Sequence, residues 1–99
     1  MIYYLLTDEE WQRRRDEPVV ASPGPDGFVH CCDERQLVAV REKYFPGDVP
    51  VLALSIDPTW LERETRYEPG SSGGPERFAH VYGDVRRADV IGVAAVPGN

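Results

Sequence analysis

The sequence has little cysteine and contains no recognisable metal-binding spacing. Only two of its 99 residues are cysteines, Cys31 and Cys32, and they are adjacent, which excludes a disulfide-stapled scaffold. On a strand, neighbouring side chains point to opposite faces, so we expect two reduced thiols with no bond between them. No C-x-x-C pattern occurs, and we expect no metal site.

The chain is also short of basic side chains and of long apolar runs. It has 11 Lys and Arg against 17 Asp and Glu, a net charge of −6 and a pI near 4.8. This balance disfavours nucleic acid as a partner, because binding phosphates requires a basic face. No stretch approaches the roughly 20 apolar residues of a membrane span, and the N-terminus lacks the basic region of a signal peptide. We therefore expect a cytoplasmic protein with no membrane contact.

Local signals place two helices in the first half of the chain. Thr7 with Glu10, and Asp33 with Gln36, have the spacing of a helix cap and its partner three residues later. Trp11 stands where it can complete a hydrophobic staple. The first helix must end before residue 18, and the second ends at the Pro-Gly-Asp of residues 46–48.

Apolar and β-branched runs predict about six strands, at residues 2–6, 28–32, 49–56, 64–68, 79–85 and 90–96. Pro50 must lie at the start or edge of its strand, because it has no N–H to donate. The Gly- and Ser-rich segment of residues 69–75 predicts a mobile loop. With no repeat or boundary, residues 1–99 form one α+β domain, with two N-terminal helices packed on a mainly antiparallel sheet.

Both histidines fall on predicted strands, and strand alternation assigns their faces. His30 shares a face with Phe28 and Cys32, and His80 shares one with Tyr82. His30 also follows a Gly- and Pro-rich loop and precedes a helix cap, a junction where functional groups concentrate.

Each of these groups also has a purely structural interpretation. His80 by itself is explained as a hydrogen-bonded core group, and Glu68 beside Arg66 as a surface ion pair. Cys32 is explained best as the staple partner of Leu37. The polar groups are therefore either solvated or converge in one pocket.

Two motifs connect these residues to a known family. They are G-F-V-H-C-C at residues 27–32 and F-A-H-V-Y-G at residues 78–83. Further matching residues extend over nearly the whole chain, namely residues 2–5, Trp11, Gln36, Phe45, Ile56, Asp57, Tyr67 and Glu68. In these features the sequence resembles the small bacterial family 952 of domains of unknown function. That family is described as remotely related to the ADP-ribosyltransferase superfamily.

The resemblance implies an ADP-ribosyltransferase-like fold and a small-molecule ligand such as NAD, bound as a substrate, or a related nucleotide. By position, Tyr4 and His30 would hold the dinucleotide and Glu68 would engage its ribose. The family usually has His at the position of Tyr4, Ser at that of Cys32 and Pro at that of Ala79. The expected catalytic residues are His30, Glu68 and His80, and the expected ligand-binding residues are Tyr4, Cys32, Arg66 and Tyr82.

Three functions remain open at this stage. The chain is an ADP-ribosyl- or related glycosyl-type transferase, in which Glu68 stabilises an oxocarbenium-like centre, or a non-catalytic binding module of the same fold, or a structural protein. Convergence of His30, Glu68 and His80 on one cleft, with Tyr4 at its wall, would favour the first two. The loop of residues 69–75 is then the natural rim or lid.

Overall fold

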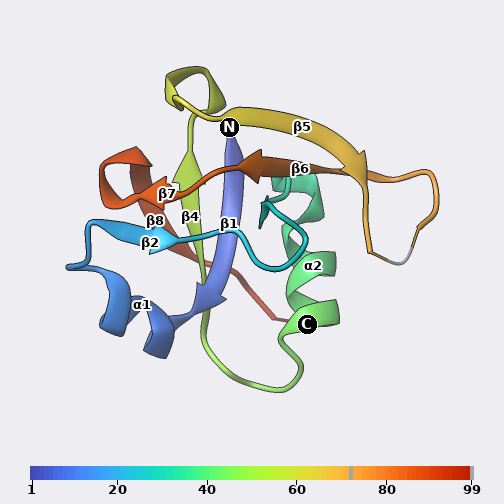
Figure 1. Ribbon diagram of the computed structural model, residues 1–99. Coiled ribbons are helices and arrows are strands. Elements are labelled where there is room, and N and C mark those ends of the chain that lie inside the picture. The colour runs from blue at the N-terminus through green and yellow to red at the C-terminus, as the bar shows by residue number, and fades with distance from the viewer. Residues whose placement is uncertain (72, 99) are drawn as a thin grey trace.

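The strands form three small antiparallel sheets in the computed structural model, which describes residues 1–71 and 73–98 (Figure 1). The first sheet has the order β1-β4-β8, with β1 at Ile2–Thr7, β4 at Val51–Ile56 and β8 at Val90–Ala95. The second pairs β2 (Val19–Ala21) with β7 (Val85–Arg86), and the third has the order β3-β6-β5, with β3 at Val29–His30, β6 at Arg77–Tyr82 and β5 at Glu64–Pro69. In Figure 1, β5 and β6 run side by side from the N-terminal end of β1 towards the side of the molecule where α2 lies.

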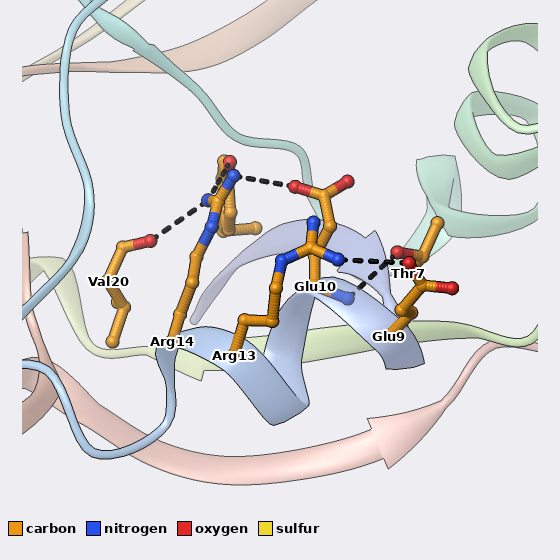
Figure 2. Close-up of polar contacts among 7 residues, drawn as sticks. Thr7, Glu9, Glu10, Arg13, Arg14 and Val20 are labelled. Carbon is orange, nitrogen blue, oxygen red and sulfur yellow. Dashed lines mark hydrogen bonds and ion pairs between the residues drawn. The ribbon is translucent and has the colours of Figure 1, made fainter.

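The first helix, α1 (Asp8–Arg14), begins at the predicted cap. Thr7 Oγ1 accepts a hydrogen bond from the backbone N–H of Glu10 at 3.1 Å. The Glu10 carboxylate does not return to the cap but pairs with Arg14 at 2.6 Å (Figure 2). Leu6 is buried and Trp11 packs against the same cluster, as the staple spacing predicted.

The second helix begins with a 3₁₀ turn, η1 (Glu34–Gln36), and continues as α2 (Leu37–Tyr44). Gln36 Oε1 accepts from the backbone N–H of Asp33 at 2.9 Å. Gln36 is buried, and its amide nitrogen donates to the Glu76 carboxylate and to the carbonyl of Arg77, each at 2.9 Å. The predicted capping residue therefore also ties the start of α2 to the start of β6. Two further 3₁₀ turns are η2 (Pro58–Trp60) and η3 (Arg87–Asp89).

The expectation of about six strands was too low, because eight are described. The short strands β2 and β7 were missed, and the predicted strand at residues 79–85 is broken in two. The break lies at Gly83, whose φ of +155° is open to glycine but strained for other residues. The predicted strand at residues 28–32 is reduced to β3, and Cys32 instead forms an isolated bridge with Tyr3. The strand predicted at residues 49–56 starts at Val51, so Pro50 lies directly before β4 and not within its first residues.

Two apolar clusters build the core, and the two adjacent cysteines belong to different clusters. Cys31 belongs to the first cluster with Ala79 and Val81, and Cys32 to the second, against which Leu37 packs. Both thiols are free, as the strand interpretation predicted. Because Ala79 and Val81 point into the first cluster, the alternate residues of β6 must point to the opposite face of its sheet.

The described residues include no helix that is long and apolar enough to cross a membrane.

Candidate functional site

The two histidines are direct neighbours across the third sheet. His30 of β3 is the cross-strand partner of His80 of β6, and Arg66 of β5 is the partner of His80 on its other side. The imidazole rings lie 5.3 Å apart, edge to face. Strand alternation thus brings the predicted polar face of three strands together.

His80 is buried beneath an aromatic ring. Only 3% of its surface is exposed, and Phe28 stacks on the imidazole with the ring centroids 3.9 Å apart. Phe28 also lies 4.7 Å from the ring of His30 and 5.4 Å from that of Tyr82. One phenyl ring therefore orders three side chains that carry polar atoms.

The Glu68 carboxylate connects His80 with Tyr82. Its Oε1 lies 2.9 Å from Nδ1 of His80 and accepts a hydrogen bond from the hydroxyl of Tyr82 at 2.5 Å. These hydrogen bonds, that of Tyr82 first, lower the pKa of Glu68, and the same carboxylate raises the pKa of Tyr82. Glu68 is thus held as a carboxylate at neutral pH.

His30 is paired with a different carboxylate, that of Asp26. Its Nε2 lies 2.7 Å from Oδ2 of Asp26, in the loop before β3, and both side chains are partly exposed. The hydrogen bond to His30 lowers the pKa of Asp26. The site therefore holds two carboxylate–imidazole pairs, one with a buried imidazole and one with both side chains open to solvent.

Arg66 reaches this cluster through Tyr82. Its guanidinium lies 4.6 Å from the centre of the Tyr82 ring, a cation–π distance. Its ion-pair partner is Glu64, at 2.9 Å, and not Glu68, so the alternative interpretation of Glu68 as the surface partner of Arg66 is wrong. The alternation of β5 puts all three side chains on one face, and the Glu68 carboxylate is already bonded to His80 and Tyr82.

A cavity of about 720 Å³ lies beside the histidines, within the size range of small-molecule sites. Both His30 and His80 line it, and so do Tyr4 and Cys32. Glu68, Arg66 and Tyr82 are not among the described lining residues, so Glu68 faces the cavity only through His80. The remaining wall comes from the loop before β3, from η1 and α2, and from segments around β1 and β6, including Tyr3, Gly24, Asp26, Phe28, Gln36, Lys43, Tyr44, Phe45, Glu76 and Phe78.

Two of the predicted ligand-binding residues have structural partners as well. The Tyr4 hydroxyl accepts a hydrogen bond from Arg14 at 3.3 Å. Cys32 is buried in the second cluster, where burial raises the pKa of its thiol to about 12. At neutral pH this thiol is an apolar wall group and not a nucleophile.

The loop between β5 and β6 borders the cavity, as predicted. Gly70, Ser71 and Gly73 line it, and the hydroxyls of Ser71 and Tyr44 lie 3.1 Å apart. Ser72 of this loop lies outside the described residues, and its mobility stays a prediction.

Asp26 and Phe28 were missed as site residues by the sequence interpretation. Phe28 carried a usable signal, since it shares strand alternation with His30. Asp26 carried none, because its contact with His30 depends on the turn of the intervening loop. No group of three potential metal-binding side chains occurs among the residues that the structure describes.

The pair of Glu68 and His80 has the arrangement of a positioned base. When Nδ1–H of His80 is donated to Glu68, Nε2 carries the lone pair and can accept a proton. A carboxylate that fixes the imidazole tautomer in this way is a recurring device of general base catalysis.

Two solved structures have a similar fold. Both are of protein CC0527 from Caulobacter crescentus, one of them a double mutant with two introduced methionines, and each is 22% identical to this chain. The TM-scores are 0.77 for the double mutant and 0.68 for the other form, with 97% of this chain and 85% of that chain covered. No curated protein matches the sequence. Residues 5–93 match the family described as "Protein of unknown function (DUF952)", and the chain therefore belongs to that family.

Proposed function

We propose that this chain is a small enzyme of the ADP-ribosyltransferase type, which binds NAD or a related nucleotide in the cavity beside His30 and His80. The observation that carries the proposal is the contact of Glu68 with Nδ1 of the buried His80, a residue that also lines the cavity. A buried imidazole with a fixed tautomer beside a ligand-sized space is the setting of a general base.

The lining suits the nicotinamide end of NAD. That ring is planar and positively charged, and aromatic faces attract cations. The aromatic residues Tyr3, Tyr4 and Phe28 line the cavity. Two acidic residues, Asp26 and Glu76, and one basic residue, Lys43, line it as well. The aromatic rings and the excess of carboxylates favour a flat cationic group over an anionic one.

The proposed reaction transfers ADP-ribose to a nucleophile such as water or a hydroxyl group. The bond between C1′ of the ribose and the nicotinamide nitrogen breaks, and its electron pair leaves with nicotinamide, which becomes neutral. The nucleophile forms the new bond to C1′ and gives its proton to Nε2 of His80. Glu68 acts through His80 as a positioning residue, because it holds Nδ1.

Release of nicotinamide from NAD tests the proposal. Glu68→Gln keeps the shape of the side chain but removes the negative charge and introduces an amide that can donate to Nδ1 as well as accept from it, so the His80 tautomer is no longer fixed. We expect kcat to fall at least about 100-fold with little change in KM. Glu64→Gln is the matched control, since Glu64 lies on the same face of β5 and binds Arg66. His80→Gln variants that release nicotinamide at the wild-type rate would refute the assignment of the base.

A non-catalytic nucleotide-binding module is the second candidate, and the contact of Tyr4 favours it. The Tyr4 hydroxyl is already held by Arg14, at the position where the resemblance implies a group that holds the dinucleotide. This candidate predicts that NAD and ADP-ribose raise the melting temperature by mass action while no nicotinamide is released. An unchanged melting temperature with both compounds would exclude both candidates.

A further inference from the structure

A second, smaller cavity adjoins the first. Its volume is about 390 Å³, and its described lining consists of Tyr4, Arg14 and residues 19–22. Tyr4 and Ser22 line both cavities, so these two residues form a shared wall. A ligand longer than the first cavity would reach the second by passing Tyr4.

Arg14 is the charged group of the second cavity, and it is held in place by three contacts (Figure 2). Its Nη1 donates to the Tyr4 hydroxyl at 3.3 Å and to the carbonyl of Val20 at 3.1 Å, and its Nη2 donates to Glu10 at 2.6 Å. Two of these acceptors are neutral, and only Glu10 is an anion. The guanidinium is therefore oriented by neutral groups that an incoming anion does not need to displace.

The burial of this ion pair differs from that of its neighbour on the same helix. The side chains of Arg14 and Glu10 are 35% and 32% exposed, whereas those of Arg13 and Glu9 are 62% and 85% exposed. Charge-assisted hydrogen bonds gain strength where water is partly excluded. Arg14 is thus the better placed of the two arginines to bind an anion.

The two cavities differ in their charged lining. The first is lined by Asp26, Glu76 and Lys43, whereas the charged residue among the described lining of the second is Arg14. Arginine is suited to phosphate because its planar fork matches two phosphate oxygens. A molecule with a flat cationic ring at one end and phosphates further along fits this order of sites.

We propose that the second cavity binds a phosphate group of the nucleotide whose ring occupies the first, with Arg14 as the residue that recognises it. Binding replaces Glu10 as the anionic partner of Nη2, while Tyr4 and Val20 keep the guanidinium in place. The inference rests on the proposed function for the identity of the ligand, but not for the anion site itself.

The binding of pyrophosphate alone tests the anion site. A comparison of NAD binding with nicotinamide riboside binding tests whether this site contributes to nucleotide binding. We expect Arg14→Gln to weaken pyrophosphate and NAD binding at least about tenfold and to leave nicotinamide riboside, which has no phosphate, within about twofold. Arg13→Gln is the matched control, since it removes the same charge and an equivalent ion pair from the same helix. Equal affinities of the two variants for pyrophosphate would overturn the proposal.

A gain-of-affinity variant guards against misfolding as an explanation. Glu10→Gln removes the competing anion, and we expect it to tighten pyrophosphate binding about three- to tenfold, whereas Glu9→Gln does not. If the wild type binds pyrophosphate at Arg14 but neither NAD nor ADP-ribose, the proposed function fails and the anion site stands. If NAD binds equally well to the Arg14 and Arg13 variants, the anion site fails and the proposed function stands.

Discussion

Glu68 binds His80 along a diagonal of the sheet, since neither residue is the direct cross-strand partner of the other. Glu68 is opposite Phe78, and His80 is opposite Arg66, yet Glu68 Oε1 lies 2.9 Å from Nδ1 of His80. The long glutamate side chain reaches from its position opposite Phe78 to His80, two residues further along β6, as diagonal neighbours can. This reach lets one carboxylate orient a buried imidazole and also accept from Tyr82.

The stability that the Glu68 carboxylate contributes will depend on pH in the acid range. Its hydrogen bonds with Tyr82 and His80 lower its pKa in the folded state. Such a group contributes stability that is fully present above its unfolded pKa of about 4.3 and is lost as the pH falls through the lower folded value. We expect Glu68→Gln to be less stable than the wild type at pH 6, with the gap closing towards pH ~2.5, in urea unfolding. A gap that is constant over this range would contradict the assigned contacts.

Removing the Tyr82 hydroxyl will raise the pKa of Glu68 towards its usual value. The hydrogen bond from Tyr82 is the largest cause of the lowered pKa, and that from His80 is the next. In Tyr82→Phe only the latter remains, so an upward shift is expected in a ¹³C NMR titration of the Glu68 carboxyl. Tyr67→Phe is the control, because the Tyr67 hydroxyl donates to Asp33 and not to Glu68.

Gln36 will be more important for stability than its place at a helix start suggests. In Gln36→Leu the carbonyl of Arg77 and the N–H of Asp33 lose their partner, which costs about 1–3 kcal/mol in the free energy of unfolding. Gln12→Leu provides the comparison, since the hydrogen bonds of Gln12 with Asp8 and Arg15 are both exposed, and it should change stability by less than about 0.5 kcal/mol. Chemical denaturation of both variants measures the difference.

Local sequence signals predicted the elements whose causes are local. Thr7 caps α1, β4 starts after Pro50, and Cys31 and Cys32 point into different clusters, each for the reason that its own neighbours supply. The pair of β2 and β7 was missed because each is only two or three residues long and its partner is distant in the chain. Such strands exist through their pairing and carry no periodic signal of their own.

The same limit explains what could be predicted of the candidate site. Strand alternation predicted that His30 and His80 each lie on a polar face of their strand. The register between β3 and β6 places the two residues opposite each other, so both lie on the same face of the sheet. Strand alternation could not predict that Glu68 contacts His80 as a diagonal neighbour, or that the Asp26 carboxylate contacts His30. Those contacts depend on side-chain reach and on loop geometry, which the order of residues alone does not determine.

Both thiols will be unreactive in the folded protein. Burial raises the pKa of Cys32 to about 12 and that of Cys31 further still, so neither is a thiolate at pH 8. We expect reaction with Ellman's reagent to be slow in buffer and complete, with two thiols per chain, in denaturant. Rapid labelling of one thiol under native conditions would place it at an accessible surface and contradict the burial described here.

A single methyl group at Gly70 will disturb the cavity through Phe78. A Cβ at this position would lie 2.8 Å from Cε2 of Phe78, closer than side chains tolerate, and Phe78 both lines the cavity and packs against the second cluster. Gly70→Ala must therefore shift the ring, with a cost of about 1–3 kcal/mol in unfolding free energy and weaker NAD binding. Gly24→Ala is the matched control, because Gly24 also lines the cavity but its added Cβ would meet only Asp26, at an ordinary 3.5 Å. Calorimetric titration and denaturation of the two variants measure both effects, and equal behaviour would show that the Phe78 ring moves without consequence for the cavity.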